Sequence, residues 1–167
     1  MIALIALAAS MAPFVGQNWG AKKYARVGKA LQLGSVFCIV WGLIGAAILA
    51  VSAPTLVNFF NQNPDVVRIA SQYLRIVPIS YAGAGIILVS NSAFNALGKP
   101  IPSVVMTVVR MFVLYIPLAY FGGQLYGVNG IFAAACISNL IVGIGAYLWN
   151  QRTCGVKAAK KAEALGS

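Results

Sequence analysis

The 167-residue sequence is poor in charge and poorest in acid, with two Asp or Glu residues and no His. Because the only acids are Asp65 and Glu163, no side chain is placed to activate a Ser or Cys nucleophile. Glycine-rich phosphate loops and the G-x-S-x-G string of hydrolases are also missing. An enzyme is therefore the least favoured class of function.

Cysteine is also scarce. Cys38, Cys136 and Cys154 are an odd, scattered set, so we expect no disulfide framework, and without His a structural zinc site is excluded. The 12 Lys and Arg residues give a net charge of +10, which in a soluble protein would indicate nucleic acid. Nearly all of them fall between apolar runs, where they would meet lipid headgroups, so we expect a bilayer and no nucleic acid as partner.

Apolar residues are abundant at 60% of the chain, while only 8% are charged, against about a quarter in soluble domains. About 20 apolar residues cross a bilayer as a helix, and lipid requires every backbone group to be satisfied within the protein. The runs do not alternate as barrel strands do. The sequence therefore predicts an all-α membrane protein with four full transmembrane helices, at about 31–52, 73–98, 103–121 and 130–149, and a partial one at about 2–18.

The first run, residues 2–15, is too short to span comfortably, because fourteen helical residues rise about 21 Å against a core of about 30 Å. Positive charge follows this run instead of preceding it, so it does not resemble a signal peptide. We interpret it as the back half of a helix. Residues 53–65 have the composition of a segment at the membrane surface, and residues 122–130 are predicted to form a glycine-rich turn.

The basic residues indicate which side of the membrane each connection occupies. One side receives nine of them, and by the positive-inside rule it is cytoplasmic. Residues 1–150 then form one membrane domain, and 151–167 form a basic cytoplasmic tail. The nine are Lys22, Lys23, Arg26, Lys29, Lys99, Arg152, Lys157, Lys160 and Lys161.

Three strings resemble the multidrug and toxic compound extrusion (MATE) transporters. The string APFVGQNWGAKKYARVGKAL is similar to the family's helix-to-loop signature before a basic cytoplasmic loop. The strings APTLVNFF, followed by YLRIVPISY, and FNALGKPIPS resemble the approach to the tenth helix and the turn between the tenth and eleventh. The matching positions of the signature loop are Pro13, Val15, Gly16, Gln17, Gly20 and Ala21.

The resemblance implies most of one six-helix lobe of a twelve-helix transporter in the inner membrane. It implies efflux of drug-like, often cationic compounds by alternating access, in exchange for sodium ions or protons. A missing N-terminal lobe, in the same full-length chain or a partner chain, would complete the protein, and this chain alone is not expected to be active. A related lipid-linked saccharide flippase and a small non-transporting membrane protein are the alternatives.

Arg110 is the sharpest single candidate, because a charge inside a span costs about 2.5–3.5 kcal/mol and faces protein or water. It would either line the substrate cavity, with the other lobe's acid as a possible partner, or snorkel to the cytoplasmic interface. Tyr81, Asn91 and Asn95 share one helix stripe and would contact substrate or clamp neighbouring helices by hydrogen bonds.

Pro78 and Pro117 each remove a helix hydrogen bond and are candidates for hinges or static kinks. Ion coupling in membranes uses buried carboxylates, and both acids of this chain fall outside the predicted spans. The site of the coupling ion is therefore expected outside this chain, and no covalently bound cofactor or metal is expected.

Overall fold

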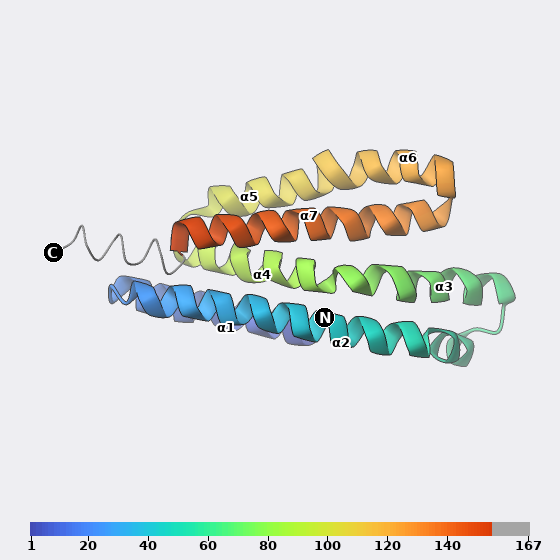
Figure 1. The fold of residues 1–167 in the computed structure, drawn as a ribbon, viewed down its shortest axis with the longest axis horizontal. Coiled ribbons are helices and arrows are strands. Elements are labelled where there is room, and N and C mark those ends of the chain that lie inside the picture. Colours follow the sequence, from blue (N-terminus) through green and yellow to red (C-terminus); the bar gives the residue numbers. More distant parts are fainter. Residues whose placement is uncertain (155–167) are drawn as a thin grey trace.

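The computed structural model describes residues 1–154, and this part of the chain is helical almost throughout. It forms five rods that run up and down the long axis of the molecule (Figure 1). The first two rods are α1 (Ile2–Gly20) and α2 (Tyr24–Phe60). The third joins α3 (Pro64–Ile76), a 3-10 turn (Val77–Ser80) and α4 (Tyr81–Ala96). The fourth joins α5 (Pro100–Val108), a π-helical segment (Val109–Tyr115) and α6 (Ile116–Tyr126), and the last is α7 (Val128–Cys154).

All five rods are long and apolar enough to cross a membrane. The shortest is α1, with 19 residues, and it begins beside the middle of α2 (Figure 1). The other rods begin before the predicted spans, and all of them except the third, which ends at Ala96, also end after the spans. In particular α7 continues to Cys154, four residues into the predicted tail. Residues 155–167, the rest of that tail, lie outside the described residues.

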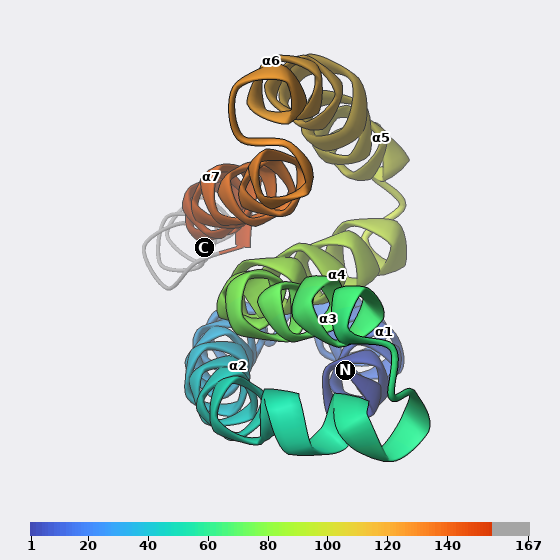
Figure 2. The same ribbon diagram turned by 90° about the vertical axis from the view of Figure 1, so that its right-hand side faces the viewer.

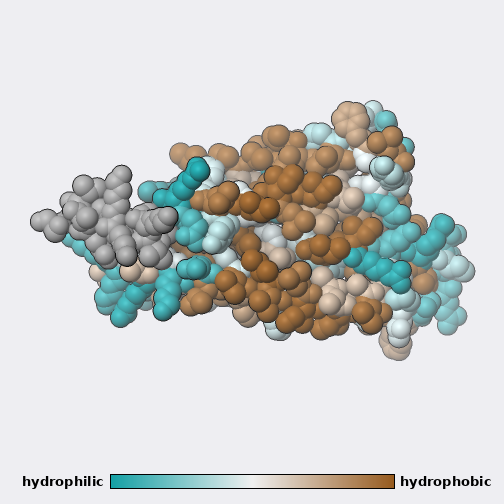
Figure 3. All heavy atoms as spheres, viewed as in Figure 1, coloured by the Kyte–Doolittle hydropathy of each residue, from teal (hydrophilic) through white to brown (hydrophobic). Residues whose placement is uncertain are grey.

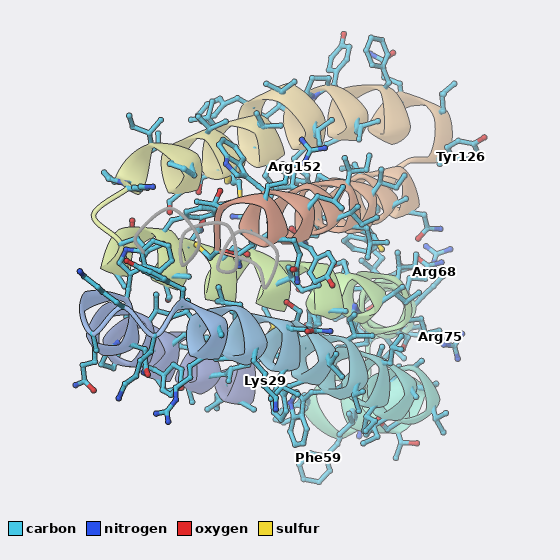
Figure 4. The ribbon with its side chains drawn as sticks, turned by 60° about the vertical axis from the view of Figure 1, so that its left-hand side comes forward. Lys29, Phe59, Arg68, Arg75, Tyr126 and Arg152 are labelled. Atoms are coloured by element: carbon cyan, nitrogen blue, oxygen red, sulfur yellow. The ribbon has the colours of Figure 1, made fainter. Side chains whose placement is uncertain are left out.

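On the face drawn in Figure 3, hydrophobic side chains cover the middle of the molecule and hydrophilic side chains gather towards both ends. Arg68, Arg75 and Tyr126 lie at one end, and Lys29 and Arg152 lie towards the other (Figure 4). This distribution agrees with the predicted division of the connections between the two sides of a membrane.

The segment at 53–65 is largely helical. Pro54 lies inside α2, and beyond it the last turns of this helix run across the end of the bundle (Figure 2). Phe59 and Phe60 are 85% and 84% exposed there. Only residues 61–63 separate α2 from α3, and the side chain of Asn63 caps α3 by accepting a hydrogen bond from the amide of Asp65.

The prediction of a glycine-rich turn over residues 122–130 was wrong. Helix α6 continues to Tyr126, Gly127 alone makes the turn with a positive φ of 58°, and α7 starts at Val128. Gly122 and Gly130 instead let α6 and α7 approach closely, because a Cβ on Gly122 would lie 2.8 Å from the carbonyl oxygen of Gly130. The glycines here serve helix packing as much as chain reversal.

Helix α4 is the centre of the bundle and packs against α1 and α2 on one side and α7 on the other (Figure 2). In the rod that contains α4, 61% of the most apolar stretch of 18 residues is buried. In the rod from Pro100 to Tyr126 the corresponding share is 6%, and its main contact is with α7. Most of that rod is therefore free to face lipid or another part of the protein.

Candidate functional site

Arg110 points into the bundle and contacts α7. Its Nη1 donates a hydrogen bond to Oδ1 of Asn139 over 3.3 Å, while its Nε is buried and has no partner among residues 1–154. Asn139 lies eleven residues after the start of α7 and fifteen before its end. The guanidinium is thus held near the middle of α7, away from the end of the bundle where Lys29 and Arg152 lie.

The backbone around Arg110 is a π-helix over Val109–Tyr115, with Pro117 just beyond it. Pro117 has no N–H to donate to the preceding turn, and the N–H of Ile116 reaches back five residues to the carbonyl of Met111. A wider turn therefore replaces the regular α-helical ladder beside the charged side chain. Such π-turns are common at functional sites.

A polar chain continues from Asn139 to the third rod. Nδ2 of Asn139 donates a hydrogen bond to Oγ of Ser80 over 3.1 Å, and Ser80 Oγ donates to the carbonyl of Val77 over 2.8 Å. Ser80 is fully buried at the end of the 3-10 turn that contains Pro78. Hydrogen bonds therefore connect α7 to two irregular segments, of which one contains Pro78 and the other ends two residues before Pro117.

Close backbone contact between α4 and α7 brings these groups together. A Cβ on Gly143 would lie 2.6 Å from Cα of Gly83, so neither position has room for a side chain. A second bond lies further along the same pair, from Nδ2 of buried Asn150 to Oγ of Ser90 over 3.2 Å. Small residues and polar bonds together hold these two parallel helices.

The three residues of the predicted stripe on α4 lie in two separate places. Asn91 and Asn95 line a pocket of about 360 Å³ together with Ser103 and Thr107 of α5, and Asn91 Oδ1 is buried without a hydrogen-bond partner in the described chain. Tyr81 lies beside Tyr73, whose ring packs edge-on against Phe132 at 5.3 Å. Arg110 does not line the pocket of the two amides.

The signature-loop residues form the end of α1 and the turn into α2. Pro13 lies within α1, Val15 is fully buried and Gly20 is the last helical residue. Gly16 and Gln17 lie in the last turns of α1, and Ala21 caps it. The turn itself uses Lys22, which adopts a positive φ of 58°, instead of either glycine. This region positions α1 against α2 and places no cluster of reactive groups together.

The sequence reasoning missed Asn139, Ser80, Asn150 and Ser90. The available signal was the spacing of the two α7 amides, because residues eleven apart lie on nearly the same helix face. Among residues 1–154 no three His, Cys, Asp or Glu side chains are close enough to hold a metal ion. The chemistry of the site therefore comes from one guanidinium, amides and hydroxyls.

Comparison with known proteins adds a consistent set of relatives. The MatE family model matches residues 1–121. A Shewanella oneidensis protein named FAD transporter is 34% identical over 165 residues, which are 99% of this chain and 36% of that protein. The chain thus spans about a third of the length of this curated relative.

Solved structures agree with this match. The Vibrio cholerae MATE transporter VcmN in its bent form is 30% identical, with a TM-score of 0.87 over 96% of this chain and 36% of its own. The inward-facing form of a multidrug resistance MATE family transporter has a TM-score of 0.82 at 19% identity, over 92% of this chain and 36% of its own. The second likeness supports the fold alone.

Proposed function

This chain belongs to the MATE family of membrane transporters, and on that premise we propose that it forms most of one lobe of an exporter of organic molecules. Export would proceed by alternating access in exchange for sodium ions or protons. The other lobe, from the same full-length chain or a partner chain, would complete the substrate cavity. The poorly buried rod from Pro100 to Tyr126 supports the need for that lobe.

The observation that carries the proposal is the cation in the middle of the span. The side-chain partner of Arg110 is the neutral amide of Asn139, so no carboxylate among the described residues neutralises its charge. A part-buried cation whose buried Nε has no partner attracts an anionic group that has lost its own hydration shell. A solute entering from water would find here a charged partner inside the membrane.

Two substrate classes compete. Cationic drugs are what the multidrug members of the family suggest, but Arg110 repels a cation at short range. A flavin dinucleotide carries a pyrophosphate, and the Shewanella relative is named for FAD. Arg110 therefore favours an anionic dinucleotide over a cationic drug. A lipid-linked saccharide flippase would need several cations in its cavity. The predicted spans contain two basic residues, Arg75 near the start of one span and Arg110 inside another.

The coupling ion would bind outside this chain. Asp65, the acid among the described residues, is 82% exposed at the start of α3 and pairs with Arg68 over 3.2 Å. It lies at the end of the bundle and is not buried in a span. Any membrane-embedded carboxylate that exchanges a proton or sodium ion belongs to the other lobe.

The test uses the full-length protein that contains this chain, expressed in cells deprived of their own drug exporters. We expect extracellular FAD to rise and resistance to cationic dyes to stay unchanged. Arg110→Gln should lower FAD export about tenfold or more, because a charge-assisted bond to phosphate is lost, at an equal membrane level of protein. Arg110→Lys, which keeps the charge, should retain more export than Arg110→Gln.

Dye resistance that rises while extracellular FAD does not would replace the dinucleotide with drugs as the substrate. Expression of residues 1–167 alone should give neither response. Export by this short chain alone would contradict the requirement for a second lobe.

A further inference from the structure

A groove between α1 and α2 lies outside the proposed transport site. It has a volume of about 480 Å³, and its walls are almost wholly apolar. Helix α4 packs against both α1 and α2 (Figure 2), and Phe14, Leu33 and Phe37 of the groove's lining are exposed, so the groove is open among the described residues. The residues that shape it are Leu7, Met11 and Phe14 of α1 and Ala30, Leu33 and Phe37 of α2.

The groove depends on a glycine in its floor. A Cβ on Gly34 would lie 2.9 Å from Cε of Met11, so the absence of a side chain lets α1 and α2 approach at this level. The flanking side chains remain open to the surroundings, with Phe14 42%, Leu33 59% and Phe37 40% exposed. The result is an apolar groove along the helix axis, with the rings of Phe14 and Phe37 in its lining.

One end of the groove is basic. Arg26 precedes Ala30 by four residues and Leu33 by seven, so it lies on the same face of α2, one turn beyond the apolar lining. Gln17 follows Phe14 by three residues on α1 and lies on the corresponding face there. Both side chains are exposed. The apolar groove therefore ends at the guanidinium of Arg26 and the amide of Gln17.

The local charge has no counterpart among the described residues. Lys22, Lys23, Arg26 and Lys29 are all exposed at the N-terminal end of α2, and its first turn contains no acid. Cations are unfavourable at this end of a helix, because the helix dipole is positive there as well. The acid Asp65 is paired with Arg68 at the opposite end of the bundle. The potential at the groove mouth is thus strongly positive and suited to an anion.

Two aromatic residues place the mouth at the level of the lipid headgroups. Trp19 and Tyr24 pack edge-on across the turn between α1 and α2, with ring centroids 4.7 Å apart. Trp and Tyr prefer the boundary between hydrocarbon and headgroups. The apolar groove then lies at the depth of acyl chains, and the basic side chains lie at the depth of phosphates.

From these observations we propose that the groove is a specific binding site for an anionic phospholipid. One acyl chain lies between α1 and α2 over Gly34, and the phosphate meets Arg26 and Lys29, with Gln17 at its side. Basic pockets between transmembrane helices on the cytoplasmic side recognise anionic headgroups in this way. This site is separate from Arg110 and does not depend on the identity of the transported solute.

The test is native mass spectrometry of the full-length protein after delipidation, with phosphatidylglycerol or phosphatidylcholine added back. We expect a phosphatidylglycerol adduct at concentrations where phosphatidylcholine gives none. The double variant Arg26→Gln/Lys29→Gln should weaken that binding by about tenfold to thirtyfold, since each basic residue near the surface contributes to the attraction. Lys99→Gln/Arg152→Gln removes the same charge elsewhere on that side and should leave it unchanged.

A second pair of variants tests the apolar part of the site. Ala30→Trp fills the groove and should also weaken phosphatidylglycerol binding about tenfold, while Ala47→Trp, exposed further along α2, should not. Equal binding of both lipids, or equal effects of the two charge variants, would overturn the proposal. So would a groove covered by the remainder of the full-length protein, which would appear as unchanged phosphatidylglycerol binding in Ala30→Trp.

Discussion

Arg110 shows what a single residue reveals in sequence and what it does not. A charge inside an apolar run is visible without a structure, because its insertion is costly and requires a reason. Its partner Asn139 is not visible in the same way. A neutral amide costs less to insert, and its role depends on which helices are neighbours, which the sequence does not state. Only the pairing of α4 with α7 brings Asn139 between Arg110 and Ser80.

At this scale we predict that Asn139→Leu destabilises the full-length protein. The substitution removes the acceptor of Arg110 and the donor to Ser80, which leaves a part-buried guanidinium without its partner. We expect a loss of about 1–2 kcal/mol in the free energy of unfolding. The measurement is thermal unfolding in detergent, followed with a thiol-reactive fluorophore that reports exposure of the buried Cys38 and Cys136.

Asn95→Leu is the matched control, because Asn95 is exposed on α4 and should tolerate the same change. If both variants unfold at the temperature of the wild-type protein, the polar chain from Arg110 to Ser80 makes no net contribution to stability.

At the scale of helices, the number and rough position of the membrane-spanning rods could be predicted, but their packing could not. In lipid, the buried and exposed faces of a helix are similarly apolar, so periodicity does not reveal which face meets a neighbour. Glycines gave ambiguous information for the same reason. Gly122 and Gly130 were predicted to lie in a turn, whereas they form the contact between α6 and α7.

The contact between α4 and α7 gives the element-scale prediction. Gly143→Leu would force a side chain into the backbone of Gly83, so we expect destabilisation by about 1–3 kcal/mol or a fall in folded protein. Gly145→Leu is the control on the same helix, because a Cβ there meets nothing within 4 Å. Equal melting temperatures for the two variants would show that the two helices separate at this level.

At the scale of the whole molecule, charge predicted the arrangement of the ends, and the structure places the basic connections accordingly. The signal is clear because basic residues outnumber acids by 12 to 2 and are concentrated in few connections. What the sequence could not supply is the extent of uncovered surface. The rod from Pro100 to Tyr126 is as apolar as its neighbours, yet it is the least buried of the five within the described residues.

Sidedness is the prediction at this scale. Lys99→Cys and Gln124→Cys place exposed thiols at opposite ends of the bundle, while Cys38, Cys136 and Cys154 are buried and contribute little background. In right-side-out membrane vesicles, an impermeant maleimide should label Gln124→Cys and not Lys99→Cys. Inside-out vesicles should give the reverse pattern. Labelling of Lys99→Cys from the outside would invert the assigned topology.

The two Asn–Ser bonds between α7 and the third rod have a mechanical consequence. Asn139 meets Ser80 near one level of the pair and Asn150 meets Ser90 about three turns further on, with Gly83 and Gly143 in backbone contact between them. Sliding α7 along the third rod would break both bonds at once, so we expect the two to move as one rigid body. The neighbouring rod from Pro100 to Tyr126 is joined to this pair at several points. Arg110 binds Asn139, Ser103 Oγ donates to the carbonyl of Asn91, and Gly122 lies against Gly130, so we expect this rod to follow the pair.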